Sequence, residues 1–392
     1  MLISLTYITL SGLILGYVCK KLHFPSLFGM IIAGILIGPH MLNIIDSSIL
    51  DISAEIRKIA LIIILIRAGL KLSLDDLKKV GRPAILMCFL PATLEVIGMV
   101  LLAPPSLGIS VLEAAILGSV IAAVSPAVIV PRMIKLIDEN YGSKKSIPQM
   151  ILAGASVDDV FVIVLFTTFT SLALGGSISV KSFIAIPVSI VVGVLVGIIT
   201  GLLLYLFFNK FHMRDSVKAI ILLGICFALT TAEDKWGKII PFASLIAVMA
   251  IGSVIKKKKQ QLATRLSGKF DKLWVAAEIF LFVLVGASVE IETLKSAGLS
   301  AVILIMCVLV FRMLGVFLCM LGTKLNKKER LFCMLAYTPK ATVQAAIGGL
   351  PLAMGLACGS VVLMVSVVAI MITAPLGAFA IDITYKKFLE NN

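Results

Sequence analysis

Long apolar stretches separated by short polar loops run through the whole chain. They divide it into segments with boundaries near residues 2–19, 25–38, 54–72, 82–103, 111–137, 147–174, 183–208, 216–232, 239–255, 271–288, 298–322, 329–356 and 359–384. A helix of roughly 20 apolar residues crosses the hydrocarbon core of a bilayer. The strands of a membrane β-barrel would instead alternate apolar and polar residues over about ten positions. The pattern therefore predicts an all-α polytopic membrane protein with about 13 transmembrane helices.

The composition agrees with this fold class and excludes a soluble domain of any size. The 392 residues are 60% hydrophobic, with a mean hydropathy of +1.12 and only 14% charged residues, against about 25% in soluble domains. The first five residues carry no basic group, so we expect the first segment to be a retained helix rather than a signal peptide. The seven cysteines have no CxxC spacing and the three histidines lie apart. We expect neither a disulfide framework nor a resident metal or cofactor.

The formal net charge of +14 has two possible explanations, which are binding to nucleic acid and basic cytoplasmic loops. Most of the 35 lysines and arginines lie in the connections that follow odd-numbered segments or in the C-terminal tail. Cytoplasmic loops of membrane proteins carry this excess of basic residues. We therefore expect the N-terminus outside, the C-terminus in the cytoplasm and no nucleic-acid partner.

The second half of the chain resembles the first. Short matches at offsets of about 215 residues include 67–72 with 286–291, 95–98 with 312–315, and 125–126 with 338–339. They pair segments 3, 4 and 5 with segments 10, 11 and 12, and this odd shift inverts the second half in the membrane.

Inverted repeats are the architecture of many secondary transporters. We expect one membrane transporter domain over residues 1–392. Its first repeat would cover about 1–174, a connector helix about 183–208 and the second repeat about 216–384. A structural duplication without transport is the alternative.

Segments 5 and 12 carry a proline at corresponding places, after a hydroxyl residue. Ser125 precedes Pro126 in the first, and Thr338 precedes Pro339 in the second. Proline removes a backbone donor and clashes with the preceding turn, so both helices are expected to break there. Matched interruptions in two inverted halves indicate a binding site near the middle of the bilayer. The alternative is a pair of ordinary proline kinks.

Charged residues lie inside several apolar segments. Asp158 and Asp159 are adjacent in the middle of segment 6, where a charged aspartate costs about 2.5–3.5 kcal/mol. Glu95, Arg312 and Lys340 also lie within segments. Buried charges pair, and two bases against three acids leave one carboxylate free to take a proton or a cation. The alternative is a structural acid pair neutralised by a basic neighbour.

Three motifs carry a resemblance to a known family. Residues 156–159 read Ser-Val-Asp-Asp, residues 125–131 read Ser-Pro-Ala-Val-Ile-Val-Pro, and residues 339–348 read Pro-Lys-Ala-Thr-Val-Gln-Ala-Ala-Ile-Gly. Over nearly its whole length the chain resembles the monovalent cation/proton antiporter superfamily, and within it the NHA, or sodium/hydrogen exchanger 9B, branch. The resemblance implies a core domain that slides against a dimerisation domain, and a homodimer in a lipid membrane.

The same resemblance implies roles for the charged residues. Asp159 would be the direct ligand of a monovalent cation with Asp158 as its partner, and Glu95 and Lys340 would form a salt bridge that braces the crossed half-helices. The charge count makes Arg312 the expected partner of Asp158. Many double-Asp antiporters carry lysine where this chain has Arg312. Because arginine does not release its proton, we expect one cation per proton and no net charge movement.

We therefore expect a secondary-active antiporter in the plasma membrane of a bacterial cell, which exchanges Na⁺ or Li⁺ for H⁺. The broken helices and Ser156 would line the site. Ser125, Thr338 or carbonyls of the broken helices would supply further oxygen ligands, which hard cations prefer. The alternatives are potassium/proton exchange, a sodium-coupled carrier of an organic anion, a membrane enzyme with an aspartyl dyad, and a passive scaffold.

Overall fold

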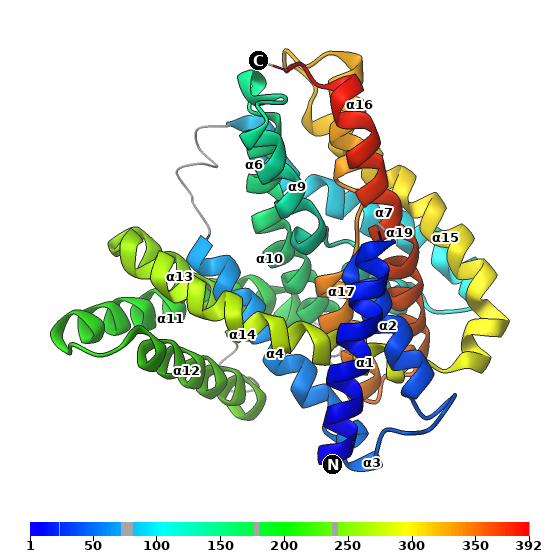
Figure 1. Ribbon diagram of the computed structural model, residues 1–392, viewed down its shortest axis with the longest axis horizontal. Helices are drawn as coiled ribbons and strands as arrows, with labels where there is room; N and C mark the ends of the chain where they lie inside the picture. The colour runs from blue at the N-terminus through cyan, green and yellow to red at the C-terminus, as the bar shows by residue number, and fades with distance from the viewer. Residues whose placement is uncertain (23, 72–80, 176–179, 237–241, 392) are drawn as a thin grey trace. The chain divides into compact units, whose positions relative to one another are not determined.

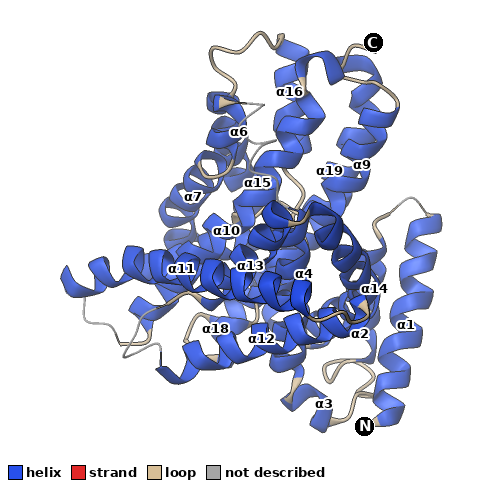
Figure 2. Cartoon of the chain, turned by 90° about the vertical axis from the view of Figure 1, so that its left-hand side faces the viewer, coloured by secondary structure: helices blue, strands red, loops and turns tan. Residues whose placement is uncertain are grey.

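The computed structural model describes residues 1–392 except 23, 72–80, 176–179, 237–241 and 392. The described residues are almost entirely helical (Figure 2). The helices are α1 (Leu2–Lys21), α2 (Ser26–Ile37), α3 (Ser47–Asp51), α4 (Ser53–Lys71), α6 (Arg82–Met87), α7 (Leu90–Leu107), α8 (Val111–Ile121), α9 (Pro126–Asp138), η1 (Ser143–Lys145), α10 (Ile147–Ala173), α11 (Val180–Lys210), α12 (Asp215–Trp236), α13 (Ser244–Lys258), α14 (Gln260–Ala287), α15 (Ile291–Cys319), α16 (Lys327–Ala336), α17 (Thr342–Ile347), α18 (Leu350–Ala353) and α19 (Gly359–Phe388).

The all-helical class predicted from the sequence is confirmed. Among the described residues, eight helices are long and apolar enough to cross a membrane, and further apolar helices are shorter. Several predicted segments fall on more than one helix. Segment 5 is divided into α8 and α9, and segment 12 is divided into α16, α17 and α18. The count of thirteen crossings and the inverted repeats stay predictions.

The chain forms two compact units. The first contains Met1–Ala54, Leu74–Phe169 and Ile279–Asn392, and the second contains Glu55–Ser73 and Thr170–Glu278. All the charged and broken-helix residues singled out in the sequence belong to the first unit. These residues therefore lie in one compact unit of the chain.

Helices α7 and α15 pack closely within the first unit, where they lie side by side (Figure 1). Two glycines permit this approach. A Cβ added at Gly98 of α7 would meet the ring of Phe311, and a Cβ added at Gly315 of α15 would meet the backbone of Pro91. The close crossing brings Glu95 of α7 within reach of α15, which carries Arg312.

A hydrophobic core surrounds the broken helices of the first unit. It includes Met133 of α9, Ile151 of α10, Phe332 of α16 and Ile381 of α19, each at most 1% exposed. Packing against apolar neighbours on several sides fixes these helices. The polar groups between them are therefore held in set positions.

The second unit has its own helix pairs. Helix α13 contacts α11 and α12, and α4 approaches α13 where Gly69 meets the backbone of Met249. Arg67 of α4 donates to Asp271 of α14 at 2.8 Å and lies over the ring of Trp274. These contacts give Arg67 an acidic and an aromatic partner within its own unit.

Candidate functional site

Helix α8 stops at Ile121 and α9 starts at Pro126, where the sequence predicts the break. The residue before a proline is disfavoured in the helical conformation, and Ser125 is extended, with φ −89° and ψ 109°. A proline at the first helical position needs no backbone donor, so a new helix can begin there. The residues between α8 and α9 are therefore left with backbone groups outside any helix.

The second break meets the first. Helix α16 ends at Ala336 and α17 begins at Thr342, with Pro339 between them. The backbone N–H of Ser125 donates to the carbonyl oxygen of Pro339 at 2.8 Å. This hydrogen bond joins the two unwound segments directly, so the structure brings the two predicted interruptions together.

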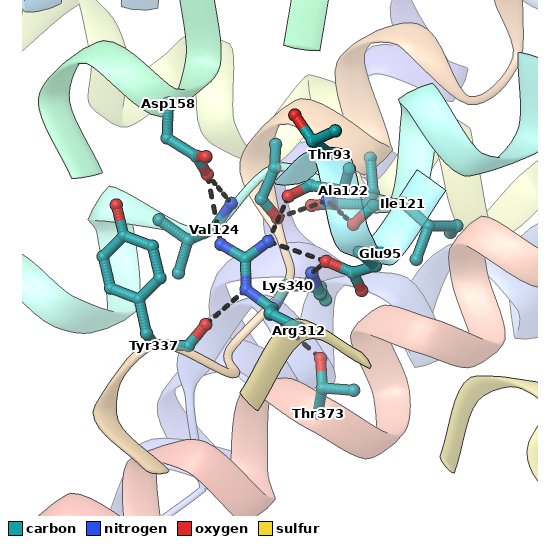
Figure 3. A network of polar contacts seen from close by, with 12 residues as sticks. Thr93, Glu95, Ile121, Ala122, Val124, Asp158, Arg312, Tyr337, Lys340 and Thr373 are labelled. Carbon is teal, nitrogen blue, oxygen red and sulfur yellow. Dashed lines mark hydrogen bonds and ion pairs between the residues drawn. The ribbon is translucent and has the colours of Figure 1, made fainter. Parts of the chain in front are cut away.

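Arg312 lies fully buried beside both breaks (Figure 3). Its guanidinium donates to Glu95 Oε2 at 2.7 Å, to Asp158 Oδ2 at 3.1 Å and to the carbonyl oxygen of Tyr337 at 2.6 Å, and also to the carbonyl oxygen of Ala122. Arginine offers five donors in a planar fork. One side chain therefore connects α7, α10 and both unwound segments.

Glu95 is shared between two cations. Its Oε2 accepts from Arg312 Nη1 and from Lys340 Nζ, the latter at 2.6 Å. The backbone N–H of Lys340 donates to Thr373 Oγ1 of α19 at 2.9 Å. The contact between Glu95 and Lys340 that the family resemblance implies is present. The structure adds Arg312 to it, so the salt bridge and the acid pair of α10 form one network.

The two adjacent aspartates differ in their hydrogen bonding. Asp158 Oδ2 accepts from Arg312 and from the backbone N–H of Val124 at 2.8 Å. Asp159 is only 4% exposed and forms no ion pair with the described residues, and the Oδ1 atoms of both aspartates accept no hydrogen bond from them. Adjacent residues of a helix point about 100° apart, so the carboxylates face different surroundings. Asp158 is held through Oδ2 by two donors, one of them a guanidinium, whereas Asp159 has no cationic partner among the described residues and can take a proton or a cation.

The other predicted site residues lie at the breaks. Ser125 is fully buried and its hydroxyl has no partner among the described residues, and Thr338 donates to the carbonyl oxygen of Leu335. Pro126 begins α9, and Pro339 provides the carbonyl that joins the breaks. Ser156 lies on α10, but its side chain is outside the described residues.

Gln344 and Tyr337 are buried residues for which the sequence predicts no role. Gln344 Nε2 donates to the carbonyl oxygens of Val120, Ile121 and Ala123. Arg312 takes that of Ala122. Each of these four carbonyls therefore accepts a hydrogen bond from a buried side chain.

Tyr337 makes a second set of contacts that the sequence does not predict. Its hydroxyl donates to the carbonyl oxygen of Met87, and its ring lies under the guanidinium of Arg312. Both Tyr337 and Gln344 stand near Thr338-Pro339 as polar residues in an apolar segment. That signal could have drawn attention to them but not to their partners.

A sequence model of the family described as "Sodium/hydrogen exchanger, transmembrane" matches residues 7–387. The chain belongs to this sodium/hydrogen exchanger family. Among relatives, it is 32% identical to human sodium/hydrogen exchanger 9B2 over 388 residues, which cover 93% of this chain and 70% of the relative. It is 31% identical to mouse sodium/hydrogen exchanger 9B1 over 381 residues, covering 94% of this chain and 66% of that relative. The predicted resemblance to the 9B branch is confirmed.

The fold of this exchanger is also found among solved structures. The sodium proton antiporter MjNhaP1 from Methanocaldococcus jannaschii superposes with a TM-score of 0.84, covers 99% of both chains and is 19% identical in sequence. At that identity the likeness establishes the fold alone. The exchanger is thus a multi-pass membrane protein with an antiporter fold.

Proposed function

We propose that the chain is a secondary-active antiporter that exchanges a monovalent cation, Na⁺ or Li⁺, for H⁺ at the Asp158–Asp159 site. The observation that carries the proposal is the difference between the two carboxylates. Asp158 forms an ion pair with Arg312 and accepts from Val124 N–H, both through Oδ2, whereas Asp159 is buried and forms no ion pair with the described residues. Membership of the sodium/hydrogen exchanger family supports the pairing of cation and proton.

The charges of the network suggest how one site serves both ions. Glu95 and Asp158 balance Arg312 and Lys340, so Asp159 is the remaining acid. Asp159 is neutralised by a proton when protons are abundant and by a cation when they are scarce. An unpaired charge in a low-dielectric interior is costly, so only the loaded site crosses between the two faces. Competition for one carboxylate then gives exchange by alternating access.

The same charges suggest the stoichiometry. Arg312 keeps its proton throughout the cycle, because a guanidinium is effectively never deprotonated in proteins. Asp159 is then the only group proposed to exchange its proton for the cation. One cation moves against one proton, and the membrane potential does no work on the cycle.

The remaining features of the proposal follow the loop charges and the family. The N-terminus lies outside and the C-terminus in the cytoplasm, as the basic loops indicate. The chain acts as a homodimer in a bacterial plasma membrane, and residues 1–392 form one transporter domain with two inverted repeats. The Ser125 and Thr338 hydroxyls supply further oxygen ligands for the cation.

Reconstitution of the purified chain into proteoliposomes tests the proposal. A pH gradient is established, and Na⁺, Li⁺ or K⁺ is then added in turn, with and without an imposed membrane potential. We expect sodium and lithium to collapse the gradient at a rate that the potential does not change. Collapse by potassium alone would replace sodium with potassium as the substrate, and sodium flux driven by the potential alone would contradict the one-to-one exchange.

A further inference from the structure

Four consecutive carbonyl groups, those of residues 120–123, lie at the end of α8, and the first three have lost their helical donors. In a continuous helix Val120 and Ile121 would accept from the N–H groups four residues later. Those N–H groups belong to Val124 and Ser125, which donate instead to Asp158 and Pro339. Ala122 would need a donor at position 126, which is a proline without an N–H. The break therefore leaves a group of carbonyl oxygens that require other partners.

Gln344 provides most of these partners. Its Nε2 lies 3.2 Å from Val120 O, 3.1 Å from Ile121 O and 2.8 Å from Ala123 O. The orientation of the amide follows from these neighbours, because the opposite orientation would place Oε1 against three acceptor oxygens. Gln344 is fully buried, so the amide group is held in place.

The group that surrounds Nε2 is also a ligand set for a cation. Three carbonyl oxygens converge on one point at the C-terminal end of a helix, where the macrodipole contributes about half a negative charge. Oxygen ligands of this kind suit hard cations, and C-terminal ends of half-helices coordinate Na⁺ in other transporters. In this chain a neutral amide occupies the point where the oxygens converge.

We propose that Gln344 is a specificity-determining residue that closes the carbonyl end of α8 to the transported cation. Its NH₂ group shares its two hydrogens among the three carbonyls and fills the point where they converge. The cation is therefore directed to the carboxylate of Asp159, where it must compete with a proton. A cation held by carbonyls alone would need no proton release, because carbonyls do not titrate. Gln344 thereby keeps cation binding coupled to protons. The inference rests on the proposed function.

Two substitutions separate this role from that of a buried hydrogen-bond donor. Gln344→Ala removes the donor and opens space beside the three carbonyls. Gln344→Met also removes the donor but keeps the volume filled. A purely structural role predicts that both variants lose stability and that neither gains a site, whereas the proposed role predicts a new cation site in Gln344→Ala alone.

The experiment measures ²²Na⁺ binding to the full chain in detergent, with each substitution made in the Asp159→Asn background. We expect Gln344→Ala to raise bound sodium several-fold over its Asp159→Asn parent, with little change as the pH falls. We expect no gain with Gln344→Met. A gain in both variants, or in neither, would overturn the inference. The level of binding in the Asp159→Asn parent itself tests the proposed function separately, since parental binding equal to wild type contradicts that assignment.

Gln344→Glu serves if Gln344→Ala does not fold. This variant keeps the shape of the side chain and places a carboxylate oxygen among the three carbonyl oxygens. The oxygens repel one another unless a cation binds between them. We expect bound sodium to rise several-fold over the Asp159→Asn parent at alkaline pH. The absence of any rise in a folded Gln344→Glu chain overturns the inference.

Discussion

Arg312 Nη1 lies 2.7 Å from Glu95 Oε2, although the two residues are 217 positions apart in the chain. Both are at most 1% exposed. They also occupy matched positions in the two stretches that suggest a repeat, at residues 95–98 and 312–315. The crossing of α7 and α15 therefore connects the two halves through a buried ion pair, to which Asp158 is attached through the same guanidinium.

Removal of Arg312 is expected to destabilise the fold strongly. Arg312→Leu leaves the carboxylate of Asp158 without its cation and Glu95 with Lys340 alone, and breaking a buried pair on one side costs about 3–5 kcal/mol. Thermal or denaturant unfolding in detergent measures the loss.

Arg132→Leu is the matched control for Arg312→Leu. Arg132 pairs with Asp382 at 3.0 Å, but both side chains are partly exposed, and such surface pairs contribute about 0–1 kcal/mol. Equal losses for the two variants would show that the buried network has no special weight in stability.

Asp159→Asn is expected to abolish cation-dependent proton flux while the protein stays folded. Asparagine keeps the shape of the side chain but has no proton to exchange and no charge to neutralise a cation. Proteoliposome flux and the melting temperature are measured on the same preparation. Asp382→Asn, which changes a half-exposed carboxylate of α19, should exchange as wild type does. The assignment is lost if the Asp159→Asn protein also does so.

The close contact of α7 with α15 predicts an order among glycine substitutions. At Gly315 an added methyl group meets the backbone of Pro91, which cannot move aside, and at Gly98 it meets the ring of Phe311, which can turn. Overpacking costs about 1–3 kcal/mol, so Gly315→Ala should lower the melting temperature more than Gly98→Ala.

Gly224→Ala is the control for this order. Gly224 lies in the interior of α12 with open space around the position of a Cβ, and alanine is favoured over glycine in a helix by roughly 0.5–1 kcal/mol. Gly224→Ala should leave the melting temperature unchanged or raise it. A Gly98→Ala protein less stable than Gly315→Ala would contradict the packing argument.

Lys145 gives a prediction of pH dependence. Its Nζ lies 2.7 Å from Glu329 Oε1, and Glu329 is only 1% exposed. The hydrogen bond to Glu329 raises the pKa of Lys145 above its ordinary value. A raised pKa means that the pair stabilises the fold below the lysine pKa of the unfolded chain, about 10.4, and that this contribution is lost as pH rises through the folded value.

Lys145→Gln should therefore lower stability by about 1–3 kcal/mol at neutral pH, because Glu329 loses its charged partner. The difference from wild type should hold from neutral pH to roughly pH 10 and shrink above it. Melting temperatures of both proteins across that range provide the measurement. A difference that shrinks well below pH 10 would assign the effect to another group.

Much of the fold follows from local properties of the sequence. Apolar length predicts helices in a membrane because the bilayer demands it, and Pro126 and Pro339 predict the two breaks because a proline lacks a backbone donor. Both breaks are present at these residues. The three motifs also sufficed to indicate the sodium/hydrogen exchanger family.

The pairing of charges was only partly accessible from the sequence. Two bases and three acids allow several arrangements with the same net charge, so a count cannot select one of them. In the structure Arg312 donates hydrogen bonds to both Glu95 and Asp158, and Lys340 donates to the same oxygen of Glu95. A planar guanidinium can serve several acceptors at once, but which acceptors it reaches depends on how α7, α10 and α15 cross.

The sequence by itself determined that this protein crosses a membrane, where its helices break, and which carboxylates cost free energy because they lie in apolar segments. Each of these properties depends on residues that are neighbours in the chain. Only the tertiary structure decided which carboxylate is fixed and which carbonyls Gln344 occupies. Val124 lies between α8 and α9, Asp158 on α10 and Arg312 on α15, and a hydrogen bond forms only where packing brings a donor to an acceptor. That packing leaves Asp159 with the buried oxygen at which we propose proton and cation compete.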